Sequence, residues 1–124
     1  RIRDDKETVL AAVRSRGAAL EFAAERLRAD REVVLAAVSR YGHALQLASA
    51  ELQADREVVL KAVAQRGESL QFASPALRAD RKVVIEAVIK ACHAPRVLGF
   101  ASPELRSDPG VVEAERYLRS CFWP

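Results

Sequence analysis

The chain has 124 residues, half of them apolar, and its 20 basic and 17 acidic side chains give a formal net charge of +3. This length and composition predict one soluble helical domain, and no apolar run approaches the roughly 18 residues needed to cross a bilayer. The mixed charges disfavour a nucleic-acid binder, which concentrates basic residues on one face. The two cysteines form no CxxC arrangement, so we expect no disulfide scaffold and favour a reducing, intracellular compartment.

One segment recurs every 25 residues. Residues 30–38, Asp-Arg-Glu-Val-Val-Leu-Ala-Ala-Val, recur with few changes at 55–63 and 80–88, and a weaker copy occupies 5–13. A fixed period of this length is typical of arrays in which each unit buries its apolar side against its neighbours. We therefore predict an all-α fold, a short α-solenoid that forms a single domain over residues 1–124. Its repeats are 5–29, 30–54, 55–79 and 80–107, followed by a capping helix at 108–124.

The chain begins without a methionine, and residues 2–5 align with 27–30, the last part of a repeat. We interpret it as a processed or trimmed segment of a longer precursor. A removed targeting sequence would fit this interpretation and makes an organelle one candidate location, although no such signal is visible.

Each repeat is predicted to begin with a long helix. Asp30 is the expected N-cap, because its carboxylate can accept hydrogen bonds from the free amides of the first turn and lies at the positive end of the helix dipole. Capping accounts in the same way for the aspartates at the start of the other repeats. The apolar residues recur at three-to-four spacing and predict a buried stripe: Val33, Val34, Ala37 and Val38. We expect Gly42, like Gly17 and Gly67, to close the helix in a left-handed conformation.

A second, shorter helix and a one-turn helix complete the repeat. Leu45, Leu47 and Ala48 predict the apolar side of the second helix, and phenylalanines occupy the position of Leu47 in the other repeats: Phe22, Phe72 and Phe100. Serine followed by proline, as at 74–75 and 102–103, marks the start of the one-turn helix. One position changes its chemistry freely and is expected on the solvent face: Ala11, Ala36, Lys61, Glu86 and Ala114.

Two departures from the repeat suggest where a partner would bind. The fourth repeat loses its glycine and gains three residues around 91–96, and insertions in repeats fall in loops that often lie on the binding face. In the fifth unit Glu113 and Arg116 replace apolar residues, as in a terminal helix that no further repeat covers. Phe122 and Trp123 either fold back on the last core layer or form an exposed anchor. The candidate partner contacts are Cys92, His93, Pro95, Arg96, Phe122 and Trp123.

Three motifs carry a resemblance to a known family: the D-R-E-V-V-L-x-A-V opening, the G-x-x-L-x-F-A-S middle and the S-P-x-L-R-x-D close. Together they resemble the tandem repeats described as domain of unknown function 4116, and the resemblance covers residues 2–118. No catalytic or ligand-binding residues are described for that family, so the resemblance implies no site. The layout is also similar to the leucine-rich-repeat variant proteins, which implies a right-handed superhelix.

Chemical sites find little support. Cys92 and His93 are adjacent, and a thiolate beside a base is a catalytic device, but sequence neighbours usually point in different directions and no third residue orients them. The soft metal ligands, which are these two residues with His43 and Cys121, lack zinc spacing. The sequence therefore predicts no enzyme, no cofactor and no metal site.

Basic residues recur at two repeat positions. The first holds Arg28, Gln53, Arg78 and Arg106, and the second holds Arg16, Tyr41 and Arg66. Repeat proteins that read one base per repeat use such columns, but they need more units than this chain has. We interpret these residues as a solvated face with local Arg–Asp pairs that contribute little energy.

The sequence thus favours a non-catalytic structural module, a small peripheral subunit or adaptor that binds other protein subunits and has no evident small-molecule substrate. An RNA-binding helical repeat and the recognition segment of a longer enzyme stay open as alternatives.

Overall fold

A computed structural model of the chain describes the backbone of residues 5–91 and 94–122 and the side chains of 5–91 and 96–117. These residues form helices and turns without strands, so the predicted all-helical fold is confirmed. Of the candidate contacts, Cys92, His93 and Trp123 lie outside the described residues, and so do the side chains of Pro95 and Phe122.

The elements repeat in a fixed order along the chain. The long helices are α1 (Lys6–Ser15), α3 (Arg31–Arg40), α5 (Arg56–Gln65), α7 (Arg81–Lys90) and α10 (Pro109–Phe122). The first three are each followed by a 3-10 helix: η2 (Gly17–Phe22), η3 (Gly42–Leu47) and η4 (Gly67–Phe72). The fourth is followed by α8 (Ala94–Leu98). A one-turn helix then ends each repeat: α2 (Glu25–Arg28), α4 (Ala50–Gln53), α6 (Pro75–Arg78) and α9 (Pro103–Arg106).

The second helix of each of the first three repeats is therefore a 3-10 helix. Three residues per turn place every third residue on the same side, and in η3 and its C-cap these are Gly42, Leu45 and Ala48, all of which are buried. The tighter winding explains how a segment of six residues presents a continuous apolar side to the long helices.

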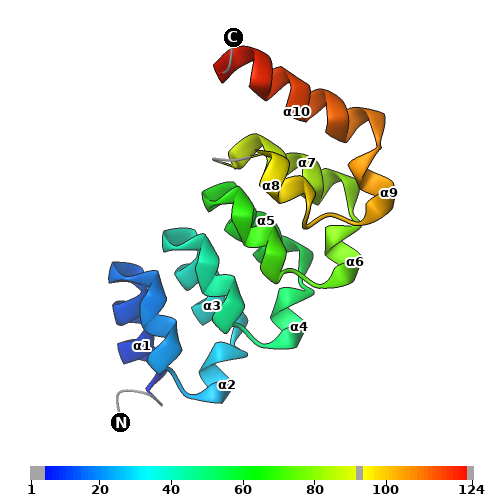
Figure 1. Cartoon of the computed structure of the whole chain (residues 1–124). Helices are drawn as coiled ribbons and strands as arrows, with labels where there is room; N and C mark the ends of the chain where they lie inside the picture. The colour runs from blue at the N-terminus through cyan, green and yellow to red at the C-terminus, as the bar shows by residue number, and fades with distance from the viewer. Residues whose placement is uncertain (1–4, 92–93, 123–124) are drawn as a thin grey trace.

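The long helices stack side by side in chain order, from α1 at one end to α10 at the other (Figure 1). Each 3-10 helix packs against the long helix of its own repeat and against that of the next, as η3 does on α3 and α5. The one-turn helices follow along one side of the stack. Because each element contacts its counterpart in the next repeat, equivalent residues lie in rows along the molecule.

The predicted valine–alanine stripe forms the core. Its members in α3 are completely buried, and so are their counterparts in α5 and α7: Val33, Val34, Ala37, Val38, Val58, Val59, Ala62, Val63, Val83, Val84, Ala87 and Val88. Each buried valine contributes roughly 1.5 kcal/mol or more relative to an exposed one. The small alanines let neighbouring repeats approach closely.

The expectation of left-handed glycines is wrong. Among the described residues no glycine has a positive φ. Glycine is required instead because the backbone of the next repeat lies against it: a Cβ on Gly17 would be 2.6 Å from the Ala37 carbonyl oxygen, and one on Gly42 would be 2.5 Å from that of Ala62. Gly67 meets Ala87 in the same way. The glycines therefore set the spacing between repeats.

The phenylalanine column was expected in the buried core, but none of its described members is fully buried. Leu47, Phe72 and Phe100 are half-buried, and Phe22 is 62% exposed. Phe72 packs edge-on against the ring of His43 in the preceding repeat, with 5.2 Å between the ring centroids. Phe72 thus packs against the repeat before its own, and within the described residues no repeat precedes that of Phe22.

Backbone hydrogen bonds join the one-turn helices of successive repeats. The amide of Ser49 donates to the carbonyl of Arg28, and that of Ser74 donates to Gln53, at 3.0 and 2.9 Å. The amide of Ser102 donates to Arg78 at 3.0 Å. The same joint thus recurs at each junction between repeats.

The position expected on the solvent face is only partly exposed. Ala11 and Lys61 are exposed, whereas Ala36, Glu86 and Ala114 are half-buried, since this side of each long helix lies near its neighbour in the stack.

Candidate functional site

The two ends of the stacked long helices carry different charges. At the N-terminal ends the predicted caps are present: the Asp30 carboxylate accepts from the amides of Glu32 and Val33, at 3.0 and 3.4 Å. Asp55 and Asp80 make the same two bonds in their repeats. The capping prediction is therefore confirmed at these helices.

Each cap carboxylate has a second role that the sequence did not reveal. The first residue of each of the helices α1, α3, α5 and α7 is a cation that pairs with the cap of the next long helix. The pairs are Lys6–Asp30 at 3.1 Å, Arg31–Asp55 at 2.9 Å, Arg56–Asp80 at 3.0 Å and Arg81–Asp108 at 2.9 Å. Lys6 and Arg31 also reach the acids two residues beyond those caps, Glu32 and Glu57. We call this row of caps and cations the paired edge.

Pairing changes the acidity of the caps. The hydrogen bond from Arg31 lowers the pKa of Asp55, that from Arg56 lowers the pKa of Asp80, and Arg81 does the same for Asp108, in each case against an opposing effect of burial. These carboxyls therefore stay ionised further into the acid range than free aspartates.

At the C-terminal ends the cations lack such partners. This row, which we call the basic edge, consists of exposed side chains in the last turn of a long helix or just after it: Arg14, Arg16, Arg40, Arg66 and Lys90. Within the described part of the chain none of them forms an ion pair. A helix C-terminus favours nearby cations, but no carboxylate among the described side chains pairs with them.

A hollow of about 260 Å³ lies at the basic edge between the first two repeats. Its lining residues include two arginines from successive repeats together with a serine, a tyrosine and small residues: Ser15, Arg16, Gly17, Ala18, Arg40 and Tyr41. Planar guanidinium groups bind carboxylates and phosphates through paired hydrogen bonds. The hollow is thus suited to an anionic group.

Next to the hollow lies a row of aromatic contacts. The rings of Tyr41 and His43 are 5.9 Å apart, and the Nδ1 of His43 lies 3.1 Å from the hydroxyl of Ser69 in the next repeat. Burial lowers the pKa of His43, and the positive charges of Arg66 and Arg96 lower it further. His43 is therefore neutral at neutral pH and joins two repeats. No group of three potential metal ligands occurs among the residues that the structure describes.

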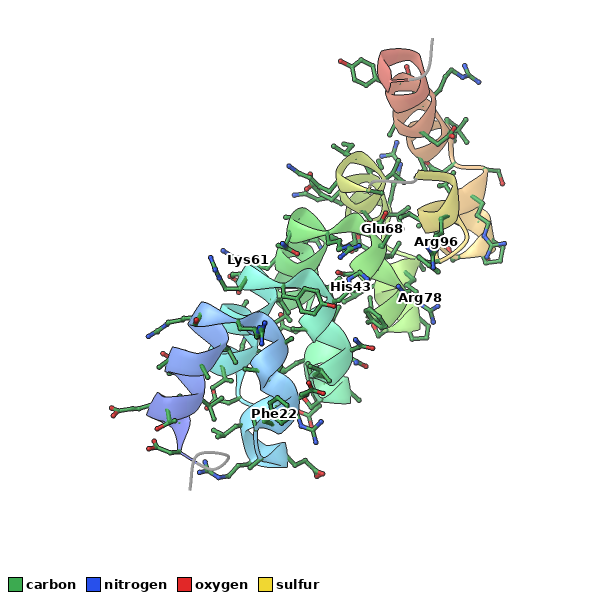
Figure 2. All side chains as sticks on the ribbon, turned by 60° about the vertical axis from the view of Figure 1, so that its left-hand side comes forward. Phe22, His43, Lys61, Glu68, Arg78 and Arg96 are labelled. Atoms are coloured by element: carbon green, nitrogen blue, oxygen red, sulfur yellow. The ribbon has the colours of Figure 1, made fainter. Side chains whose placement is uncertain are left out.

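Of the predicted contacts, Arg96 has a described side chain, and it is exposed. It occupies the register position held by His43 and Glu68 in the two preceding repeats, and Figure 2 shows these three residues near one another along the stack. Pro95 lies within α8 and Phe122 ends α10. Arg96 thus adds a cation beside the basic edge, whereas the roles expected of Cys92, His93, Pro95, Phe122 and Trp123 remain predictions.

The first basic column, which the sequence made a candidate for RNA binding, forms hydrogen bonds within its own repeat at two of its four positions. Gln53 Nε2 donates to the Leu45 carbonyl at 3.0 Å, and Arg106 Nη2 donates to that of Gly99 at 3.0 Å. Arg28 and Arg78 are half-buried, with each Nε shielded from solvent. Gln53 and Arg106 therefore support the turn of their own repeats. The second column, which contains Arg16 and Arg66, contributes to the basic edge.

An apolar groove of about 420 Å³ lies between α7 and α10. Ile89 and Tyr117, which are 46% and 68% exposed, lie in it at equivalent positions of the two helices. Gly110 and Ala114 leave room there because they replace Lys82 and Glu86 of the preceding long helix. Exposed apolar surface of this kind is typical of protein contacts.

These features define an all-helical tandem-repeat protein without an evident reaction centre in its described part. The model of the family named Domain of unknown function (DUF4116) matches residues 5–53 and 55–106, and the chain belongs to that family. No curated protein and no solved structure is significantly similar to the chain. None of the described helices is both long and apolar enough to span a bilayer.

Proposed function

We propose that the chain is a non-catalytic interaction module, a short right-handed solenoid of four repeats and a cap that docks on another protein as a small peripheral subunit or adaptor. The observation that carries this proposal is the difference between the two edges. The paired edge neutralises its cations within the stack, whereas the basic edge presents a row of cations to the outside.

The framework supports this role. The glycines, the backbone joints and the buried stripe hold the repeats in a constant register. In the register row of Ala18, His43, Glu68 and Arg96 the chemistry changes from repeat to repeat. A fixed frame that carries varied surface residues is how repeat proteins build extended binding surfaces.

Two surfaces are available to a partner. The first is the basic edge with Arg96, close in sequence to the predicted contacts Cys92, His93 and Pro95. The second is the groove between α7 and α10, close in sequence to the predicted contacts Phe122 and Trp123. An apolar groove favours a protein partner over a nucleic acid, because aromatic and aliphatic anchors dominate protein interfaces.

The direct test is the native size of the chain in an extract of cells that express it, by size-exclusion chromatography with mass-spectrometric detection. We expect it to elute with a larger assembly, and crosslinks from residues near Arg96 should identify the neighbouring subunit. Elution near its own mass of 13.6 kDa would contradict the proposal.

RNA is the second candidate ligand, and the basic edge is the observation that favours it. Binding to phosphates by these cations would weaken steeply with salt. A filter-binding titration at two ionic strengths separates this function from docking on a protein that relies on the apolar groove.

A further inference from the structure

The basic edge and its hollow point to a particular kind of partner. We propose that they bind an extended segment rich in aspartate and glutamate, contributed by another protein. This inference rests on the proposed function and specifies the partner surface that the interaction module recognises.

The basic edge carries more cations than its helices require. A cation in the last turn of a helix is stabilised by the helix dipole, which accounts for Arg14, Arg40 and Lys90. Arg16 and Arg66 are different, because each is the residue after its helix and has an extended backbone, with φ of −146° and −154°. The dipole effect weakens beyond the last turn, so these two arginines exceed what the helices themselves require.

The hollow has two arginines and no acidic residue in its lining. Arg16 and Arg40 come from successive repeats and line the same depression, although like charges that share a site repel each other. No acidic residue lines this hollow. A carboxylate entering it would satisfy two guanidinium groups at once, and the hydroxyl groups of Ser15 and Tyr41 offer further donors.

Nucleic acid is the alternative ligand for this edge. Single-stranded RNA binds to such grooves through aromatic platforms on which successive bases stack. Tyr41 is the one aromatic residue lining the hollow, and its ring already lies against His43, which in turn contacts Phe72. At the equivalent position in the neighbouring repeats Tyr41 is replaced by Arg16 and Arg66. The edge therefore offers repeated charge without repeated stacking, which suits carboxylates better than bases.

The experiment measures binding of a fluorescent ten-residue peptide that alternates glutamate with serine, by anisotropy at low and moderate salt. The variants are Arg16→Glu and Arg40→Glu in the hollow and Arg66→Glu farther along the edge. The matched control is Lys82→Glu, which changes the net charge equally but lies on the paired edge, where Glu32 and Glu57 occupy the same register position. Circular dichroism of each variant verifies that it is folded.

We expect the peptide to bind the unaltered chain, each hollow variant to lose at least tenfold in affinity, Arg66→Glu to lose less, and Lys82→Glu to stay within twofold. A peptide with glutamine in place of glutamate should not bind. Equal losses in Lys82→Glu would show that net charge alone attracts the peptide and would overturn the proposal. Absence of binding by the unaltered chain would overturn it as well.

A third outcome would be that a uridine decamer binds more tightly than the peptide and that the same variants lose this binding. RNA would then replace the acidic segment as the ligand of the basic edge. Failure of the peptide experiment leaves the proposed function testable on its own. If the Arg40→Glu chain still elutes with the larger assembly in an extract, the module docks through another surface, and the inference about the basic edge alone is wrong.

Discussion

The two ends of the stacked helices are held together by different interactions. At the paired edge, ion pairs link each repeat to the next, and their geometry depends on flexible side chains at the surface. At the opposite end, the glycines allow backbone to touch backbone, and the cations of the basic edge form no ion pair with any described side chain. The comparison suggests that packing fixes the spacing between repeats, while charges at one edge support that spacing and charges at the other face outward.

The largest effect on stability should come from adding a methyl group at a glycine that contacts the next repeat. In Gly42→Ala the new methyl group would meet the Ala62 carbonyl oxygen at 2.5 Å and the Ser69 hydroxyl at 2.8 Å, so the second and third repeats must separate. We expect a loss of about 1–3 kcal/mol in the free energy of unfolding, as for other overpacked sites. Urea denaturation followed by circular dichroism measures it. Gly99→Ala is the control, because its nearest contact is at 3.2 Å, and an equal loss there would contradict the role given to Gly42.

Breaking the paired edge should cost less. Asp55→Ala removes both the helix cap and the partner of Arg31, and we expect a loss of roughly 1–2 kcal/mol, most of it from the cap. Asp55→Asn keeps a capping side chain and removes the charge, so its loss should stay below about 1 kcal/mol. The same urea titrations separate the two contributions. If both variants lost equal stability, the ion pair and not the cap would dominate.

Acid should weaken the paired edge and leave the charges of the basic edge unchanged. The pKa values of Asp55, Asp80 and Asp108 are lower in the folded chain than in the unfolded one, so the unfolded chain binds more protons as the pH falls. Their stabilisation is therefore present above the unfolded value of about 3.9 and is lost as the pH falls through the folded values. Thermal melts from pH 6 to pH 2 should show this loss, and a triple substitution by asparagine should reduce it.

A smaller, separate effect is expected from His43. Its pKa is lowered in the folded chain by burial and by nearby arginines, so protonation favours unfolding once the pH falls below the unfolded value of about 6.5. The unaltered chain should therefore lose a little stability between pH 7 and pH 5, before the aspartates titrate. Ala18 occupies the equivalent position in the first repeat, so His43→Ala introduces a residue that the array already carries there. This variant should remove the shallow dependence of stability on pH in thermal melts.

The smallest effect should be a gain. Position 82 is equivalent to that of Glu57, which pairs with Arg31. Lys82→Glu therefore places an acid where Arg56 could pair with it in the same way. A surface pair of this kind contributes about 0.2–1 kcal/mol at low salt. Urea titrations at two ionic strengths should show a small stabilisation that salt removes. A destabilised variant would indicate that the paired edge does not repeat regularly.

Local features were predictable from the sequence, and features that join repeats were not. The Asp30 cap and the valine stripe depend on residues within one helix, so spacing alone revealed them. The role of Gly42 depends on a carbonyl twenty residues later, and the pairing of Arg31 depends on a carboxylate in the next repeat. Phe22 was misjudged for a related reason, since Phe72 at the equivalent position packs against His43 of the preceding repeat. The partner contacts predicted at 92–93 and Trp123 fall outside the described residues.

The joints between the one-turn helices have a consequence for how such a protein changes over generations. Each joint uses only the amide of a serine and the carbonyl of an arginine or a glutamine, groups that every residue except proline possesses. A duplicated repeat would therefore find its bonding partner on either side without compensating mutations. Length can be gained or lost one unit at a time, while point substitutions adjust the exposed rows independently.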